Sequence, residues 1–118
     1  MSDPITDDEV EPGVSSWEPT TDVVELALLG KLIEECSELT KIAARCVMRG
    51  LDDVDDDGIS NGWALLTELG DVQARINDVS SVLNMRDDLI ELRAEAKSVF
   101  HLRWLRHLKQ RFGSKRDP

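Results

Sequence analysis

Three long segments of the chain carry apolar residues in alternating steps of three and four, the spacing that places side chains on one face of an α-helix. These helices are expected at about residues 22–49, 60–83 and 86–112. Asp22 can cap the first helix, and Gly50 follows its end. No segment alternates polar and apolar residues as a half-buried strand does. The pattern therefore predicts an all-α fold.

The apolar stripe of each helix defines its expected core. The stripe of the first helix is Leu29, Leu32, Cys36, Leu39, Ala43 and Cys46. The stripe of the second is Leu65, Leu69, Val72, Ile76, Val79 and Leu83. The third helix offers Leu89, Leu92, Ala96 and Val99, and its later apolar residues shift to another face. On this pattern Cys36 is a core residue and not a nucleophile.

The length of the helices bears on assembly. At 1.5 Å per residue the first helix would be about 40 Å long, and it needs neighbours of comparable length. One chain of 118 residues supplies three helices and closes its own core only marginally. We therefore expect an antiparallel helical bundle of the four-helix type that is completed by homo-oligomerisation, most simply as a dimer.

The charge of the chain limits its partners and its location. It has 24 acidic and 14 basic residues and a formal net charge of -10, which argues against nucleic acid as the main partner. Its longest apolar run is four residues, so neither a membrane span nor a signal-peptide core is expected. Two cysteines are too few for a disulfide scaffold, which fits a cytoplasmic location.

The distribution of charge predicts the domain organisation. Residues 1–21 form an acidic, proline-containing arm that is expected to be flexible. Residues 22–112 form the single all-α domain, and residues 113–118 form a short basic tail.

Carboxylates interrupt the apolar pattern at two places. Glu35 and Glu38 are three residues apart on the first helix, and so are Glu68 and Asp71 on the second. Residues three apart lie on the same side of a helix, here at the edge of the buried face. If the two helices pack antiparallel, four carboxylates converge, and their repulsion is costly unless cations neutralise it. Oxygen-only clusters suit Mg²⁺ or Mn²⁺, which in turn suit phosphate substrates.

The simpler alternative is that these carboxylates are solvated or paired with a base one turn away. Lys31 could pair with Glu35, and Arg75 could pair with Asp71. The spacing alone does not decide between the two interpretations.

The two motifs together resemble a known family. Glu34-Glu35-x-x-Glu38, followed after 29 residues by Glu68-x-x-Asp71, is similar to the E-E-x-x-E … E-x-x-D signature of the MazG-type all-α nucleoside triphosphate pyrophosphohydrolases. The resemblance covers about residues 25–100. It implies a dimer or tetramer, Mg²⁺ dependence, and cleavage of an NTP or dNTP to the monophosphate and pyrophosphate.

The resemblance also implies roles for individual residues. Glu35, Glu38, Glu68 and Asp71 would ligate the metal, with Glu35 or Glu38 as general base. Glu34 would be an accessory carboxylate, and Asp78 stands where relatives often carry a polar residue at the site. A phosphoribosyl-ATP pyrophosphohydrolase-like activity is a related possibility.

Further residues could contact the substrate. Polyphosphate sites commonly add Arg or Lys to the metal ions, and the third helix offers Lys97 and Arg103. Relatives carry an arginine one turn after that lysine, whereas Lys97 is followed by His101, so the match is partial. Trp63 could stack on a nucleobase, although packing is its commoner role. Either basic residue could equally lie on the surface.

Two other interpretations compete with the enzyme. Asp53-x-Asp55-x-Asp57-Gly58 matches the opening of an EF-hand calcium loop, but the twelfth position is Ala64 instead of glutamate, so a solvated acidic loop is favoured. The chain could also be a non-enzymatic helical interaction module whose acidic arm and basic tail engage partner proteins or other copies.

Overall fold

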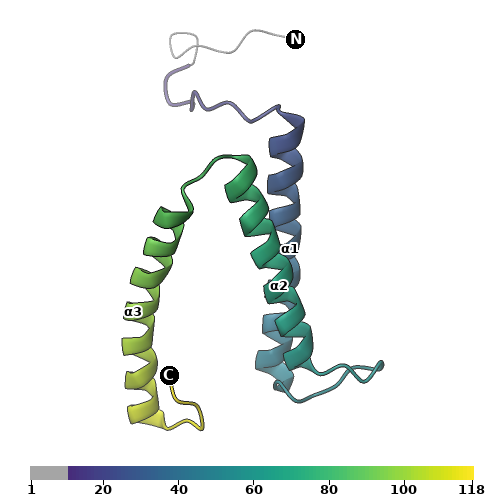
Figure 1. Ribbon diagram of the computed structural model, residues 1–118, viewed down its shortest axis with the longest axis vertical. Coiled ribbons are helices and arrows are strands. Elements are labelled where there is room, and N and C mark those ends of the chain that lie inside the picture. The colour runs from purple at the N-terminus through teal and green to yellow at the C-terminus, as the bar shows by residue number, and fades with distance from the viewer. Residues whose placement is uncertain (1–10) are drawn as a thin grey trace. The chain divides into compact units, whose positions relative to one another are not determined.

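The computed structural model describes residues 11–118, which form three helices connected by loops (Figure 1). Helix α1 is Val23–Arg49, α2 is Asn61–Val82 and α3 is Asp87–Phe112. The described residues contain no strand, only an isolated antiparallel bridge in the α1–α2 loop. The predicted all-α fold class is confirmed.

The chain divides into two compact units, Met1–Val79 and Ser80–Pro118. The first contains α1 and nearly all of α2, and the second contains α3 and the C-terminal tail. Residues 1–10 of the expected acidic arm lie outside the described residues, and the single domain over residues 22–112 stays a prediction. No helix of the described chain has both the length and the hydropathy of a membrane span.

The ends of α1 are set by two residues that the sequence singles out. The Asp22 carboxylate accepts hydrogen bonds from the backbone N–H groups of Val24 (3.0 Å) and Glu25 (2.9 Å). These groups have no acceptor within the helix, so the aspartate accepts hydrogen bonds from donors that would otherwise lack a protein partner. At the other end Gly50 has φ 85°, a left-handed conformation that glycine adopts without strain.

Asn61 joins the end of α1 to the start of α2. Its side chain is buried, and its Nδ2 donates a hydrogen bond to the Gly50 carbonyl at 2.9 Å. The thiol of Cys46 donates to the Asn61 carbonyl at 3.7 Å, and the backbone N–H of Gly62 donates to the Leu51 carbonyl at 2.8 Å. The two helices therefore form an antiparallel hairpin, as Figure 1 shows.

Replacing Asn61 by alanine is expected to lower the free energy of unfolding by about 1–3 kcal/mol, because the hydrogen bond from its buried side chain to the Gly50 carbonyl is then lost. Chemical denaturation followed by circular dichroism measures this change. Asn77→Ala on exposed α2 surface is the matched control and is expected to have a small effect. Equal stability of the two variants would show that Asn61 does not hold the hairpin.

The packing face of α1 differs from the predicted stripe at every second position. The buried or half-buried residues of α1 that follow this spacing are Leu28, Leu32, Glu35, Leu39, Ile42 and Cys46; Glu25 and Arg45 are also half-buried. Leu32, Leu39 and Cys46 agree with the prediction, but Cys36 is exposed, and its prediction as a core residue is wrong. The physical reason is that Glu35, and not the apolar Cys36, occupies the middle of the α1 face toward α2.

In α2, too, ionisable residues occupy positions on the packing face that were predicted to hold apolar residues. Val72 and Val79 lie on its packing face as predicted, whereas Leu69 and Ile76 are 52% and 37% exposed. Glu68 and Arg75, each one residue earlier, are half-buried in their place. The predicted stripe assumes that apolar residues always take the core positions, and here ionisable ones do.

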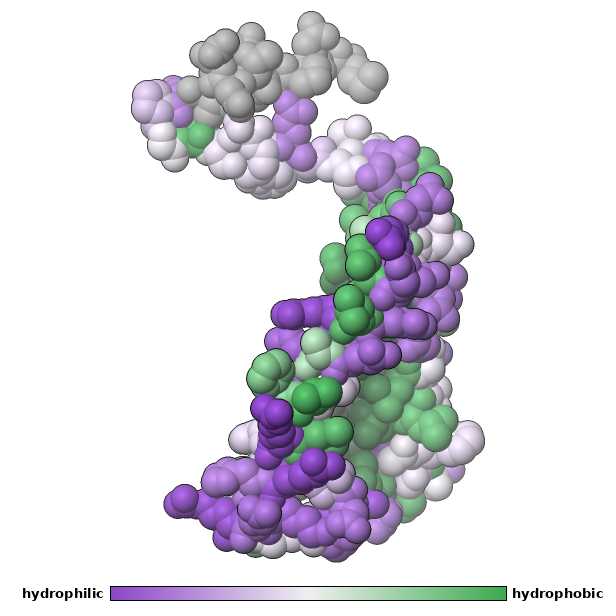
Figure 2. Space-filling view, turned by 60° about the vertical axis from the view of Figure 1, so that its left-hand side comes forward, coloured by the Kyte–Doolittle hydropathy of each residue, from purple (hydrophilic) through white to green (hydrophobic). Residues whose placement is uncertain are grey.

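Helix α3 has no buried residue. Of its predicted stripe, Leu89 is 51% exposed, Leu92 is 62% exposed and Val99 is 53% exposed. Figure 2 shows hydrophobic residues at the surface among hydrophilic ones. The apolar side chains predicted for the core-facing stripe of α3 are therefore exposed.

Candidate functional site

The antiparallel hairpin brings three of the four predicted carboxylates together. Glu35 on α1 and Glu68 and Asp71 on α2 each offer one oxygen, and these oxygens all lie within 4.8 Å of one another. Glu35 and Glu68 are half-buried on the packing faces, and Asp71 is exposed one turn beyond Glu68. We call these three residues the carboxylate cluster. Its members come from two helices, so the fold of the hairpin and not local sequence assembles it.

Glu68 lies in the least favourable environment of the cluster. Its Oε2 atom is shielded from solvent, and no hydrogen-bond partner for it lies within residues 11–118. Burial raises the pKa of Glu68 above its usual value, and the negative charges of Asp71, Glu35 and Glu38 raise it further. A buried, unpaired oxygen among like charges is destabilising unless a proton or a cation binds there.

The bases that could neutralise the cluster pair elsewhere. Lys31 forms its ion pair with Glu34 (3.0 Å), not with Glu35. Arg75 forms its ion pair with Asp78 (3.5 Å), not with Asp71. Within the described part of the chain, the cluster thus has no basic partner, and the alternative of simple charge pairing does not account for it.

The remaining predicted site residues lie outside the cluster. Glu38 is exposed on α1, close enough to Glu68 for its charge to raise that residue's pKa. Trp63 is 59% exposed in the first turn of α2. Lys97 and Arg103 are exposed on α3, in the second compact unit, so their substrate contacts stay predictions.

An apolar cavity of about 390 Å³ lies between the N-terminal half of α1 and the later part of α2. The ion-paired residues Lys31, Arg75 and Asp78 contribute to its lining. The other lining residues are Val23, Val24, Ala27 and Leu28, none of which the sequence analysis assigned to a site. Their signal in the sequence was the number of apolar residues between positions 23 and 29, which is larger than one packing stripe needs.

One aspartate of the acidic loop between α1 and α2 accepts hydrogen bonds from the backbone of the same loop. The Asp55 carboxylate accepts hydrogen bonds from the backbone N–H groups of Asp57 and Ile59, each at 2.9 Å. This arrangement agrees with the interpretation as a solvated turn.

The charge repulsion at Glu68 predicts a pH-dependent stability. Because the pKa of Glu68 is raised on folding, this carboxyl binds more protons in the folded than in the unfolded chain above about pH 4.5, so its contribution to stability falls as pH rises from there toward neutrality. Glu68→Gln removes this contribution. Without added metal and with a chelator, the variant is expected to melt at a higher temperature than the parent at pH 7, with the difference shrinking toward pH 4.5.

The exposed Glu91 on α3 provides the matched control for this measurement, since Glu91→Gln changes the same chemical group away from the cluster. Thermal melts of parent and both variants across this pH range compare them directly. A difference between parent and Glu68→Gln that is constant with pH would contradict the assignment of the repulsion to Glu68.

Comparisons of the chain with family models, with curated proteins and with solved structures each returned no match. The function is therefore inferred from the residues and the geometry of this chain.

Proposed function

We propose that the chain is a Mg²⁺-dependent nucleotide pyrophosphohydrolase that cleaves an NTP or dNTP to the monophosphate and pyrophosphate. It would clear (d)NTPs or non-standard nucleotides. The observation that carries the proposal is the carboxylate cluster, whose three oxygens lie within 4.8 Å and which has no basic partner in the described chain. The resemblance of the two carboxylate motifs to the MazG-type family supports it.

The donor set of the cluster fits a hard divalent cation. It consists of carboxylate oxygens alone, the ligands that Mg²⁺ and its substitute Mn²⁺ prefer. The solvent-shielded Glu68 Oε2, which has no hydrogen-bond partner in residues 11–118, is an atom that such an ion would satisfy. Glu35, Glu68 and Asp71 would hold the ion. Bound there, it supplies positive charge against the charge that develops on the phosphates.

The chain itself supplies the proton acceptor. Glu38 is exposed and lies one turn from Glu35, outside the three oxygens that approach one another. Its carboxylate is therefore free to take a proton from the attacking water. The hydrolysis consumes one water and breaks the bond between the α and β phosphates. Asp78 and Arg75 line the neighbouring apolar cavity, which suits the less polar part of a nucleotide.

The active form is proposed to be a homodimer or homotetramer. Large apolar side chains on all three helices are exposed in the single chain, among them Leu69 on α2 and Leu92 and Val99 on α3. Exposed apolar surface of this kind marks an interaction site. A second copy of the chain would complete the expected bundle around α3.

The reaction is tested by its products. The chain is incubated with Mg²⁺ and a panel of canonical and modified nucleotides, and the products are separated by chromatography. The expected products are a nucleoside monophosphate and pyrophosphate in equal amounts. A diphosphate with orthophosphate, or no turnover across the panel, would contradict the proposed reaction.

A non-enzymatic interaction module is the second candidate, and the exposed apolar side chains of α3 favour it. The two candidates differ in their response to Mg²⁺. The enzyme is expected to be stabilised thermally by Mg²⁺, and Glu68→Gln, which removes a carboxylate of the cluster, is expected to abolish that effect. The module is expected to be indifferent to the ion with and without the substitution.

A further inference from the structure

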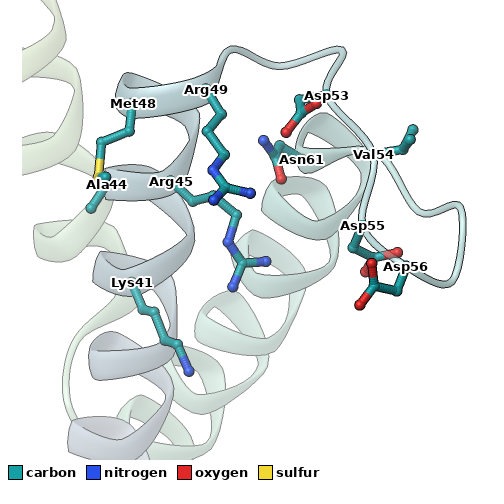
Figure 3. A pocket seen from close by; sticks show the side chains of 10 residues that line it. All are labelled: Lys41, Ala44, Arg45, Met48, Arg49, Asp53, Val54, Asp55, Asp56 and Asn61. Carbon is teal, nitrogen blue, oxygen red and sulfur yellow. The ribbon is translucent and has the colours of Figure 1, made fainter.

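A second cavity, of about 460 Å³, lies at the other end of the hairpin, between the C-terminal half of α1, the acidic loop and the start of α2 (Figure 3). One wall carries the basic residues Lys41, Arg45 and Arg49. They are four residues apart, so they form one row along α1 with steps of roughly 6 Å. Figure 3 shows all three side chains extending from α1 toward the loop side of the cavity. We call these residues the basic row.

The charges of the basic row have no partner among the described residues. The ion pairs of the described chain are made by Lys31, Arg75, Arg86 and Lys109. No hydrogen bond or ion pair of a side chain of the basic row occurs within residues 11–118. Like charges one turn apart on a helix destabilise it unless an anion lies between them. A chain with a net charge of -10 nevertheless keeps three such cations together.

The facing wall contains the nearest possible internal partners, Asp53, Asp55 and Asp56. The Asp55 carboxylate is occupied by two backbone N–H groups of its own loop. Asp53 and Asp56 are exposed and lie more than 4.0 Å from the nitrogens of the basic row, since no such ion pair forms in the described chain. The cavity between the two walls therefore separates opposite charges and leaves space for a ligand.

The basic row continues the flank of α1 that carries Glu38. The four residues Glu38, Lys41, Arg45 and Arg49 follow one another in steps of three, four and four, which places them along one side of the helix. The first cation thus lies about one turn beyond the candidate proton acceptor. A chain of phosphates is the ligand that matches a row of cations, because each phosphate offers oxygens to a separate base.

We propose that this cavity binds a diphosphate or triphosphate group, held by Lys41, Arg45 and Arg49. The two guanidinium groups donate paired hydrogen bonds to phosphate oxygens, and the Lys41 ammonium contributes a point charge. Asp53 and Asp56 compete with the ligand for the same cations. The group is either the phosphate tail of a nucleotide or free pyrophosphate, and only the first source depends on the proposed function.

Calorimetric titration of the full chain with sodium tripolyphosphate in a chelator tests the site without metal and without turnover. The parent is expected to bind, and Arg45→Met with Arg49→Met is expected to weaken binding by roughly tenfold or more. Arg93→Met with Arg106→Met, two exposed arginines of α3, is the matched control and is expected to keep parental affinity. Circular dichroism establishes that each variant keeps its helices.

Asp56→Asn is expected to change the affinity for tripolyphosphate in the opposite direction. Removing the competing carboxylate is expected to strengthen tripolyphosphate binding several-fold, with the effect reduced at high salt. If the basic row only attracts its own loop, this variant loses stability and gains no affinity. That result, or unchanged affinity in the double arginine variant, or no binding by the parent, would overturn the proposal.

A competition experiment identifies the source of the phosphate group. Pyrophosphate and a non-hydrolysable nucleoside triphosphate are each titrated against bound tripolyphosphate, with the double arginine variant in parallel. Displacement by the nucleotide supports the nucleotide tail, and displacement by pyrophosphate alone supports the free anion. Binding is measured in a chelator and does not depend on turnover. A chain that binds tripolyphosphate but hydrolyses no nucleotide would therefore disprove the proposed function and leave this site intact.

Discussion

Turnover is expected to fall by at least about 100-fold when Glu35, Glu68 or Asp71 is replaced by its amide. Even residues that only support metal ligands change affinity or activity by about 10- to 100-fold, and these three offer the oxygens themselves. The amide keeps the shape of the side chain but removes the charge that holds a divalent cation. Initial rates with Mg²⁺ and the preferred nucleotide measure the effect.

Glu34→Gln is the matched control for these variants. Glu34 adjoins Glu35 in the sequence, but its carboxylate pairs with Lys31 at 3.0 Å, so it is expected to retain most of the activity. Circular dichroism shows whether the helices persist in each variant. Near-normal rates for all three cluster variants would disprove the metal-site assignment, whereas lost rates with lost helicity would point to a folding effect.

The mass of the chain in solution is expected to be a multiple of 13.2 kDa. Leu92→Lys with Val99→Lys on α3 is expected to return it to the monomer. Covering each apolar side chain is worth about 1.5–3 kcal/mol, so each change weakens association by at least about tenfold. A symmetric interface contains each substitution twice, which multiplies the effect. Light scattering coupled to size exclusion measures the mass.

Ser98→Lys adds the same charge to an exposed polar position of α3 and serves as the control. It is expected to keep the mass of the parent. A parent that is monomeric at micromolar concentration, or a double variant that stays associated, would contradict a role of the α3 apolar face in assembly.

The bounds of α1 were predictable because both of its ends are marked by capping residues. Asp22 caps α1 and Gly50 ends it, as the sequence indicates. α2 and α3 each begin one residue later than expected, at Asn61 and Asp87. Cap residues and glycines act on the nearest backbone groups, so their effect can be inferred without knowledge of the fold.

The side of each helix that faces its neighbour was less predictable. Hydropathy favours Cys36 over Glu35 for the packing face, yet Glu35 is the half-buried residue and Cys36 is exposed. A pattern of apolar residues cannot indicate that a polar group lies in a core position, because burial of that group depends on the facing helix. The convergence of Glu35 with Glu68 and Asp71 was expected only if the helices pack antiparallel, and that packing is what the structure supplies.

The spacing of the basic row is present in the sequence, but nothing in the sequence marks it as one wall of a cavity. Lys41, Arg45 and Arg49 read as an ordinary solvated flank of a helix until the acidic loop is placed opposite them. The course of that loop depends on contacts such as the hydrogen bond from Asn61 to Gly50, which join residues 11 positions apart.

The hairpin of α1 and α2 is expected to fold before α3 packs against another surface. The contacts that close the hairpin span short stretches of chain, as between Cys46 and Asn61, and short loops close quickly and without a partner. Helix α3 has no buried residue, so packing against a further surface is expected to stabilise it. During synthesis the hairpin leaves the ribosome first and can form alone. If a second copy of the chain covers α3, as proposed above, maturation of the third helix is a second-order process, and its rate rises with the number of finished chains in the cell.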